Sequence, residues 1–189
     1  MNTRHQQSGF TLIELIVVIV IIGVMVGMST LALSGRDQAD GIRRDADRLR
    51  AVISLLQDEA IIQSREYGLQ TFDRGYRFFI MDDQQRWIPM TEDKTFRPYT
   101  FSDGVTATLV VDGVITPISR LDERGFPEVK TPAAGETADA DSAPSIYVLS
   151  SGEMSQFEIQ LVSTFSATYY KLTGNLLGQL ALEFNQKDR

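Results

Sequence analysis

The first part of the chain carries a long, almost uninterrupted run of apolar side chains. Residues 10–33 are 24 positions in which Glu14 is the single charged residue. As an α-helix rising about 1.5 Å per residue, this run would be about 36 Å long, enough to cross a hydrocarbon core of about 30 Å. The pattern therefore predicts a hydrophobic transmembrane or assembly helix over residues 10–34.

After Gly35 the apolar positions are spaced by four and three residues, which is typical of one face of an amphipathic helix. They are Ile42, Ala46, Leu49, Ile53, Leu56 and Ala60. The opposite face is polar and carries charges of both signs, which predicts a solvated surface. It consists of Arg43, Arg44, Asp47, Arg50, Gln57 and Asp58. We expect the helix to continue over residues 35–66 and to pack on a globular domain through its apolar side.

Beyond residue 67 the pattern changes to short runs of β-branched and aromatic residues separated by turn signals, as expected for antiparallel sheets. The predicted strands are 76–80, 87–88, 106–111, 114–118, 146–149, 157–162 and 168–172. Asp112-Gly113 lies between two apolar runs and predicts a hairpin. Residues 128–144 contain almost no large apolar side chain, which predicts a mobile loop, either a plain insertion or a partner-binding site.

These patterns together predict an α+β fold. A long N-terminal helix, hydrophobic and then amphipathic, packs on a C-terminal domain at 67–189 that resembles an antiparallel β-sandwich. One globular domain with an appendage is in keeping with a chain of 189 residues.

Three interpretations of the N-terminal segment remain open on its residues alone. A cleaved secretory signal begins with basic residues and has a short apolar stretch. Arg4 and His5 give it a weak basic start, but the apolar run is longer than such signals have. A plain signal anchor accounts for the length but gives Glu14 no role, and an ionisable group at membrane depth costs about 3 kcal/mol and calls for a partner.

The third interpretation supplies that partner. A cut between Gly9 and Phe10 creates an α-amine four residues before Glu14, on the same face of the helix. The two charges would be neutralised between stacked subunits, and Glu14 would set assembly and register. The simpler alternative is that Glu14 lies at the membrane interface and reaches water.

The amino-acid composition limits the kinds of partner and active site that this protein can have. Lys and Arg number 18 against 25 Asp and Glu, a net charge of −7, which argues against nucleic acid as a partner because phosphate binding needs a clustered basic face. The chain has no Cys, and its one His, His5, would leave with the first nine residues. Nucleophile pairs built on His or Cys and His-based metal sites are then excluded.

We accordingly expect no enzyme, no catalytic residue, no metal site and no cofactor. Carboxylate pairs are the remaining candidates for catalysis, namely Asp82, Asp83, Asp122 and Glu123. Acidic residues in loops are usually only solvated, so assembly is the favoured class of function.

The residues around the start of the apolar run resemble a known processing signal. Ser8-Gly9-Phe10-Thr11-Leu12-Ile13-Glu14 is similar to the class III signal of type IV pilins and type II secretion pseudopilins. In that family a prepilin peptidase cleaves after the glycine and methylates the new N-terminal residue. The resemblance implies a leader at 1–9, cleavage between Gly9 and Phe10, N-methylation of Phe10 and an assembly role for Glu14.

Later phrases resemble, in their order along the chain, the globular part of the GspH/FimT group of this family. They are Glu59-Ala60, Ser64-Arg65-Glu66, Gly75-Tyr76-Arg77-Phe78, and Ser151-Gly152-Glu153 followed by Phe157-Glu158-Ile159. The resemblance implies a minor pseudopilin that acts in pseudopilus assembly and in protein export across the outer membrane. A minor fimbrial pilin of the same group is the alternative. From another class, a secreted or anchored binding domain or hydrolase with an ordinary signal stays open.

The resemblance also implies partners and a location. The partners are other minor pseudopilins, the major pseudopilin, the prepilin peptidase, inner-membrane lipid and secreted substrate proteins. Arg4 alone precedes the apolar run while five arginines follow it within residues 36–50, and the positive-inside rule would then place the C-terminal part in the cytoplasm. Long domains translocate despite their charges, so we expect a single-pass protein of the bacterial inner membrane with its C-terminal domain in the periplasm.

Overall fold

The computed structural model describes residues 12–118, 143–165 and 167–186, and within its helix the side chains of 12–25, 27 and 40 onward. The chain divides into two units, Met1–Asp37 and Gln38–Arg189. The predicted leader, both residues of its cleavage site and positions 128–142 of the predicted loop lie outside the described residues.

A single α-helix, α1 (Leu12–Gln63), runs from the first unit into the second. In the first unit every large apolar side chain described is exposed, from Leu12 at 76% to Met25 at 66%. Within the part of the chain that the structure describes, no helix is both long and apolar enough to cross a membrane. The side chains of 10, 11, 26 and 28–34, which belong to the predicted membrane segment, are not among those described.

The second unit combines the remainder of α1 with two antiparallel sheets. The strands are β1 (Tyr67–Phe72), β2 (Gly75–Met81), β3 (Trp87–Pro89), β4 (Tyr99–Thr100), β5 (Val105–Val111), β6 (Val114–Thr116), β7 (Ile146–Val148), β8 (Phe157–Ser163), β9 (Thr168–Gly174) and β10 (Leu180–Gln186). The first sheet has the order β3-β2-β1-β7, with β4 also paired to β2, and the second has the order β10-β9-β8-β5-β6. This arrangement confirms the predicted α+β class.

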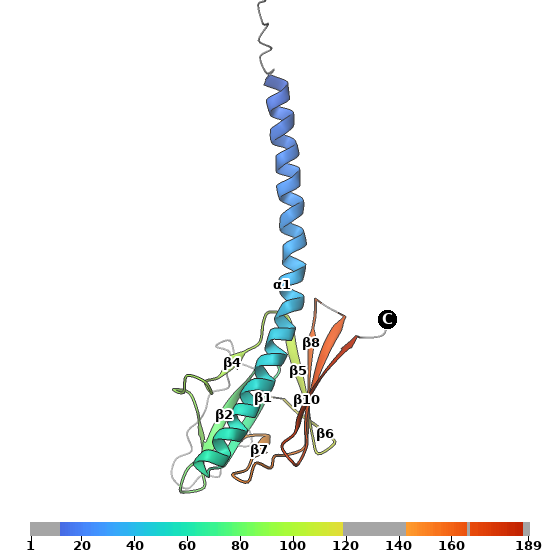
Figure 1. Ribbon diagram of the computed structural model, residues 1–189. Coiled ribbons are helices and arrows are strands. Elements are labelled where there is room, and N and C mark those ends of the chain that lie inside the picture. The colour runs from blue at the N-terminus through green and yellow to red at the C-terminus, as the bar shows by residue number, and fades with distance from the viewer. Residues whose placement is uncertain (1–11, 119–142, 166, 187–189) are drawn as a thin grey trace, which may run out of the picture. The chain divides into compact units, whose positions relative to one another are not determined.

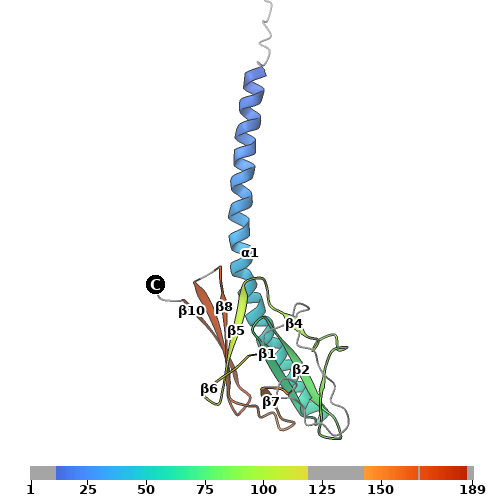
Figure 2. The same ribbon diagram turned by 180° about the vertical axis from the view of Figure 1, so that it is seen from behind.

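The apolar face of α1 forms the centre of the core in the second unit. All six residues of the predicted apolar face, from Ile42 to Ala60, are at most 1% exposed and belong to one cluster with side chains of both sheets. Figures 1 and 2 show this part of α1 lying along the sheets, with β1 and β2 on one side and β5, β8 and β10 on the other. The helix is therefore part of the β-domain's own core.

Every predicted strand has a counterpart, and the Asp112-Gly113 hairpin joins β5 to β6 as predicted. The sequence pattern did not predict β1, β4 and β10. β1 is buried at all six positions, so it has no alternation of apolar and polar residues to detect. β4 is only two residues long, whereas β10 does alternate, and its period of two was the available signal.

α1 ends three residues before the predicted boundary at 66. Ser64 has a φ of 52°, which leaves the right-handed helical region. Arg65 N–H then donates to the carbonyl of Ala60 at 3.2 Å, which closes the helix and directs the chain into β1.

Candidate functional site

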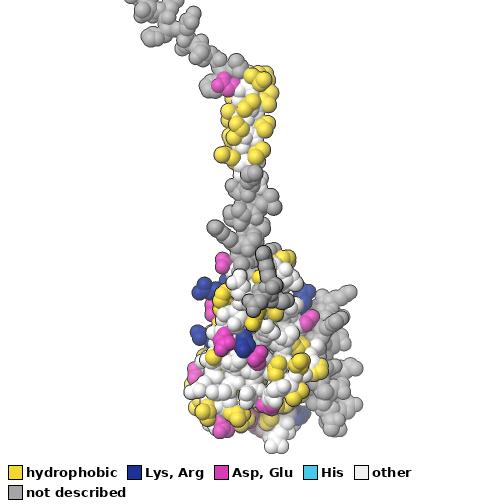
Figure 3. All heavy atoms as spheres, turned by 90° about the vertical axis from the view of Figure 1, so that its right-hand side faces the viewer, with side chains coloured by type: hydrophobic (Ala, Val, Ile, Leu, Met, Phe, Trp, Pro, Cys, Tyr) yellow, Lys and Arg dark blue, Asp and Glu magenta, His cyan; other side chains and the backbone are white. Residues whose placement is uncertain are grey.

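The described surface of α1 in the first unit is apolar except for one carboxylate. Glu14 lies in the first turn of the helix and is the only charged residue whose side chain is described there. Figure 3 shows this surface as hydrophobic, with one acidic side chain at its end. An exposed apolar surface of this kind binds another apolar partner, protein or lipid, and a carboxylate near a helix N-terminus is favoured by the positive end of the helix dipole.

In the second unit α1 carries a buried carboxylate that binds a long connection. Asp45 is fully buried and accepts hydrogen bonds from the Tyr99 hydroxyl at 2.8 Å and from Ser102 N–H at 2.7 Å. The guanidinium of Arg48, one turn further along, lies 4.4 Å from the centre of the Tyr99 ring. Because Asp45 is 54 and 57 residues from these two donors, it joins the helix to the connection between β3 and β5, which contains β4.

Aromatic rings surround this carboxylate. Tyr76 packs against Tyr99 at 5.4 Å and against Phe101 at 5.7 Å between ring centres. Burial raises the pKa of Tyr76 to about 12, against the partly opposing charge of Arg48. Burial and the hydrogen bond to Asp45 also raise the pKa of Tyr99. Both hydroxyls therefore stay neutral near neutral pH, and the Tyr99 hydroxyl keeps its proton to donate to Asp45.

Two phrases of the sequence that are far apart meet where α1 ends. The Glu66 carboxylate accepts a hydrogen bond from Ser150 N–H at 3.2 Å and another from the Ser150 hydroxyl at 2.9 Å. Gln57 on α1 donates through Nε2 to the carbonyl of Gly152 at 2.7 Å. These bonds fix the turn at 150–153 against the end of the helix.

The turn between β9 and β10 packs on Gln57 and on the turn at 150–153. Substitution of two glycines would measure how tight this packing is. Gly178 and Gly113 both have a φ of +79°, but a Cβ added at Gly178 would lie 2.5 Å from the carbonyl oxygen of Gly152, whereas one at Gly113 would meet nothing within 4 Å. We expect Gly178→Ala to lower the free energy of unfolding by about 3 kcal/mol and Gly113→Ala by about 1 kcal/mol. Denaturant unfolding followed by the fluorescence of Trp87 measures both; equal losses would contradict close packing at this turn.

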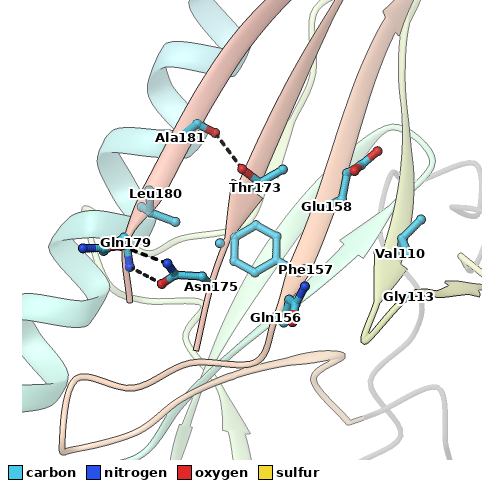
Figure 4. A pocket seen from close by; sticks show the side chains of 11 residues that line it. Val110, Gly113, Gln156, Phe157, Glu158, Thr173, Asn175, Gln179, Leu180 and Ala181 are labelled. Atoms are coloured by element: carbon cyan, nitrogen blue, oxygen red, sulfur yellow. Dashed lines mark hydrogen bonds between the residues drawn. The ribbon is translucent and has the colours of Figure 1, made fainter. Parts of the chain in front are cut away.

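An open hollow of about 360 Å³ lies between the β5–β6 hairpin, β8 and the β9–β10 hairpin (Figure 4). The Phe157 ring lies directly against Gly174, and the polar groups bond one another: Asn175 Nδ2 donates to Gln179 Oε1 at 2.9 Å. Among the described residues that line it, Glu158 is the only ionisable one, so these residues contain no acid and base pair.

Of the carboxylates considered for catalysis, the structure describes Asp82 and Asp83, and Asp82 stabilises a turn. Asp82 accepts hydrogen bonds from Arg86 and from Gln84 N–H, and these bonds lower its pKa. Asp83 lies 3.3 Å from Arg65, while positions 122 and 123 are outside the described residues. Among the residues described, no three His, Cys, Asp or Glu side chains are grouped so that they hold a metal ion.

Two polar residues of α1 that bind other parts of the domain are absent from the sequence-based prediction. Asp45 is three residues after Ile42 and four before Leu49, so helical spacing alone places it on the buried face. Gln57 belongs to the predicted solvated face, but in the structure it is half-buried and binds Gly152. No local signal identifies Gln57, because its partner is 95 residues away.

Comparison with known proteins matches both parts of the chain. Residues 4–30 match the family described as prokaryotic N-terminal methylation motif, and residues 45–178 match the family described as type II transport protein GspH. The type II secretion system protein H of Pseudomonas aeruginosa is 33% identical over 154 residues, 81% of each chain. The protein of the same name from Aeromonas hydrophila is 26% identical over 161 residues, 84% of this chain and 82% of its own.

Among solved structures, the minor pseudopilin EpsH from the type II secretion system of Vibrio cholerae matches with a TM-score of 0.55 at 21% identity. The match covers 76% of this chain and 93% of that one, and it shows a shared fold. Together with the sequence matches, it confirms the resemblance seen in residues 8–14 and in the later phrases.

Proposed function

Because the chain belongs to the family of the type II transport protein GspH, we propose that it is a minor pseudopilin, a subunit of the type II secretion pseudopilus. The observation that carries the proposal is the presence in one chain of a methylation motif at residues 4–30 and a GspH domain at 45–178. The relatives named type II secretion system protein H support secretion over a fimbrial role. The subunit acts in pseudopilus assembly and in export across the outer membrane.

In this proposal the prepilin peptidase cuts between Gly9 and Phe10 and methylates the new amine. Residues 10–34 anchor the protein in the inner membrane and then enter the pseudopilus. The exposed apolar side chains of α1 pack against neighbouring subunits, and Glu14 pairs with the α-amine of a neighbour's Phe10. The energy of assembly comes from apolar contact, and the charge pair sets the register.

The β-domain acts in recognition within the periplasm. Its partners are the other minor pseudopilins, the major pseudopilin and secreted proteins. The bonds from Asp45, Gln57 and Glu66 hold its connections rigidly on α1, so it offers a preformed surface. The work of this protein is assembly rather than catalysis.

The mass of the mature N-terminus tests the processing step and, with it, the class of protein. We expect the chain isolated from membranes to begin at N-methylated Phe10. A start at Gly35 would identify an ordinary secretory signal and overturn the proposal. An intact Met1 would identify a plain signal anchor, which also excludes a pseudopilin.

A further inference from the structure

The outer strands of the two described sheets differ greatly in length. The first sheet ends in β3 and β7, of three residues each, and β3 contains Pro89; β6, at one end of the second sheet, is also three residues long. β10, at the other end, has seven residues, contains neither Pro nor Gly, and pairs with β9 at every position without a bulge. Proteins usually shorten or interrupt such edges because an open edge pairs with other chains.

The main chain of β10 is oriented to accept a further strand. At the closed end of the β9–β10 hairpin, Asn175 N–H donates to the carbonyl of Gln179 at 3.2 Å. Hydrogen-bonded and non-hydrogen-bonded pairs alternate along an antiparallel ladder, so the N–H and C=O groups of Leu180, Leu182 and Phe184 point away from β9. Among the described strands none pairs with that side of β10.

One face of this edge carries an excess of negative charge. Lys171 on β9 lies 3.7 Å from Glu158 on β8 and 3.6 Å from Glu183 on β10, so two carboxylates share one ammonium. The side chain of Glu183 is 56% exposed at the outer end of this row. A residue facing it on an added strand would have its Cβ about 5 Å away, so Lys or Arg there would extend the alternation of charge.

The other face of the edge is apolar. Phe184 is 61% exposed, and its ring lies 5.4 Å from that of Tyr170. An apolar side chain on an added strand would cover both rings. An added strand would therefore be favoured if it carried a basic residue on the face of Glu183 and an apolar residue on the face of Phe184.

We propose that β10 is a strand-addition site for an extended segment of another polypeptide, one that presents Lys or Arg opposite Glu183 and an apolar residue beside Phe184. A second copy of this chain is disfavoured, because β10 paired with itself in full antiparallel register places two Glu183 carboxylates opposite each other. The inference concerns the folded β-domain and stands independently of the role in secretion.

Two peptide probes test the charge preference. Each has about nine residues, enough to cover β10, with Thr and Val alternating and either Lys or Glu at the central Thr position. We expect the full-length chain in detergent to bind the Lys peptide about fivefold more tightly than the Glu peptide in fluorescence anisotropy. Glu183→Lys should reverse this preference. Equal affinities, or no binding of either peptide at about 1 mM, the weak end of specific affinity, would overturn the proposal.

A pair of variants at one position tests the main-chain contact. Phe184→Pro removes an outward N–H that β9 does not use, whereas Phe184→Ala removes the same ring and keeps the N–H. We expect Phe184→Pro to bind the Lys peptide about tenfold more weakly than Phe184→Ala, the loss of about one hydrogen bond. Unchanged fluorescence of Trp87 verifies that each variant is folded. If Phe184→Pro does not fold, the reversal of peptide preference by Glu183→Lys remains as the test of the site. Equal binding by the two variants, or self-association of the native chain that Phe184→Pro abolishes, would overturn the proposal.

Discussion

Glu14→Leu is expected to reduce secretion of exported proteins about tenfold or more while N-terminal processing continues, because the α-amine of Phe10 would then be unpaired in apolar surroundings at a cost of about 3 kcal/mol. The variant keeps the apolar surface of α1 and adds one apolar side chain to it, so a loss of secretion cannot come from weaker partition of the helix into the membrane. Secretion is measured in a strain that lacks the native subunit, with the mass of the N-terminus as the measure of processing.

Two further substitutions separate charge from size at this position. Glu14→Asp keeps the charge and should retain most of the secretion, whereas Glu14→Gln keeps the length and should behave like Glu14→Leu. Normal co-assembly of Glu14→Leu with the other pseudopilins would remove the charge-pairing role. It would leave Glu14 as a side chain that simply lies at the membrane interface.

Asp45→Ala is expected to lower the free energy of unfolding by about 2 to 4 kcal/mol. The substitution leaves Ser102 N–H and the Tyr99 hydroxyl, both half-buried, without their acceptor, and each such donor without a partner costs about 1 to 3 kcal/mol. The connection to β5 would loosen from α1 at the same time. Denaturant unfolding of the full chain in detergent, followed by the fluorescence of its single Trp, Trp87, measures the change.

Asp47→Ala is the matched control on the same helix. Its carboxylate is 55% exposed and lies 3.7 Å from Arg43, so this substitution should change the free energy of unfolding by less than about 0.5 kcal/mol. Asp45→Asn keeps one acceptor oxygen, so its loss in free energy of unfolding should lie between those of Asp45→Ala and Asp47→Ala. Equal effects of Asp45→Ala and Asp47→Ala would show that the buried carboxylate contributes no more than a surface charge.

Much of this protein is encoded in patterns that are local along the chain. The apolar run around Glu14, the four-and-three spacing from Ile42 to Ala60 and the Asp112-Gly113 turn each depend on neighbours within a few residues. Local spacing sets which face of a helix or strand is apolar, so the helix, most strands and the processing motif could be predicted. The buried position of Asp45 follows from the same spacing.

Residues 8–14 and the apolar helix suffice to predict the class of the protein, and local patterning suffices to predict the α+β composition of its domain. Which polar residues are structural, and which sheet edge is open among the described strands, depends on the packing of the folded chain. Glu66 and Ser150 are 84 residues apart, and β10 is an outer strand because β9, its partner on one side, pairs with β8 on the other. Such pairings are fixed when the core buries both sheets against α1, since that burial selects one arrangement of many locally equivalent ones.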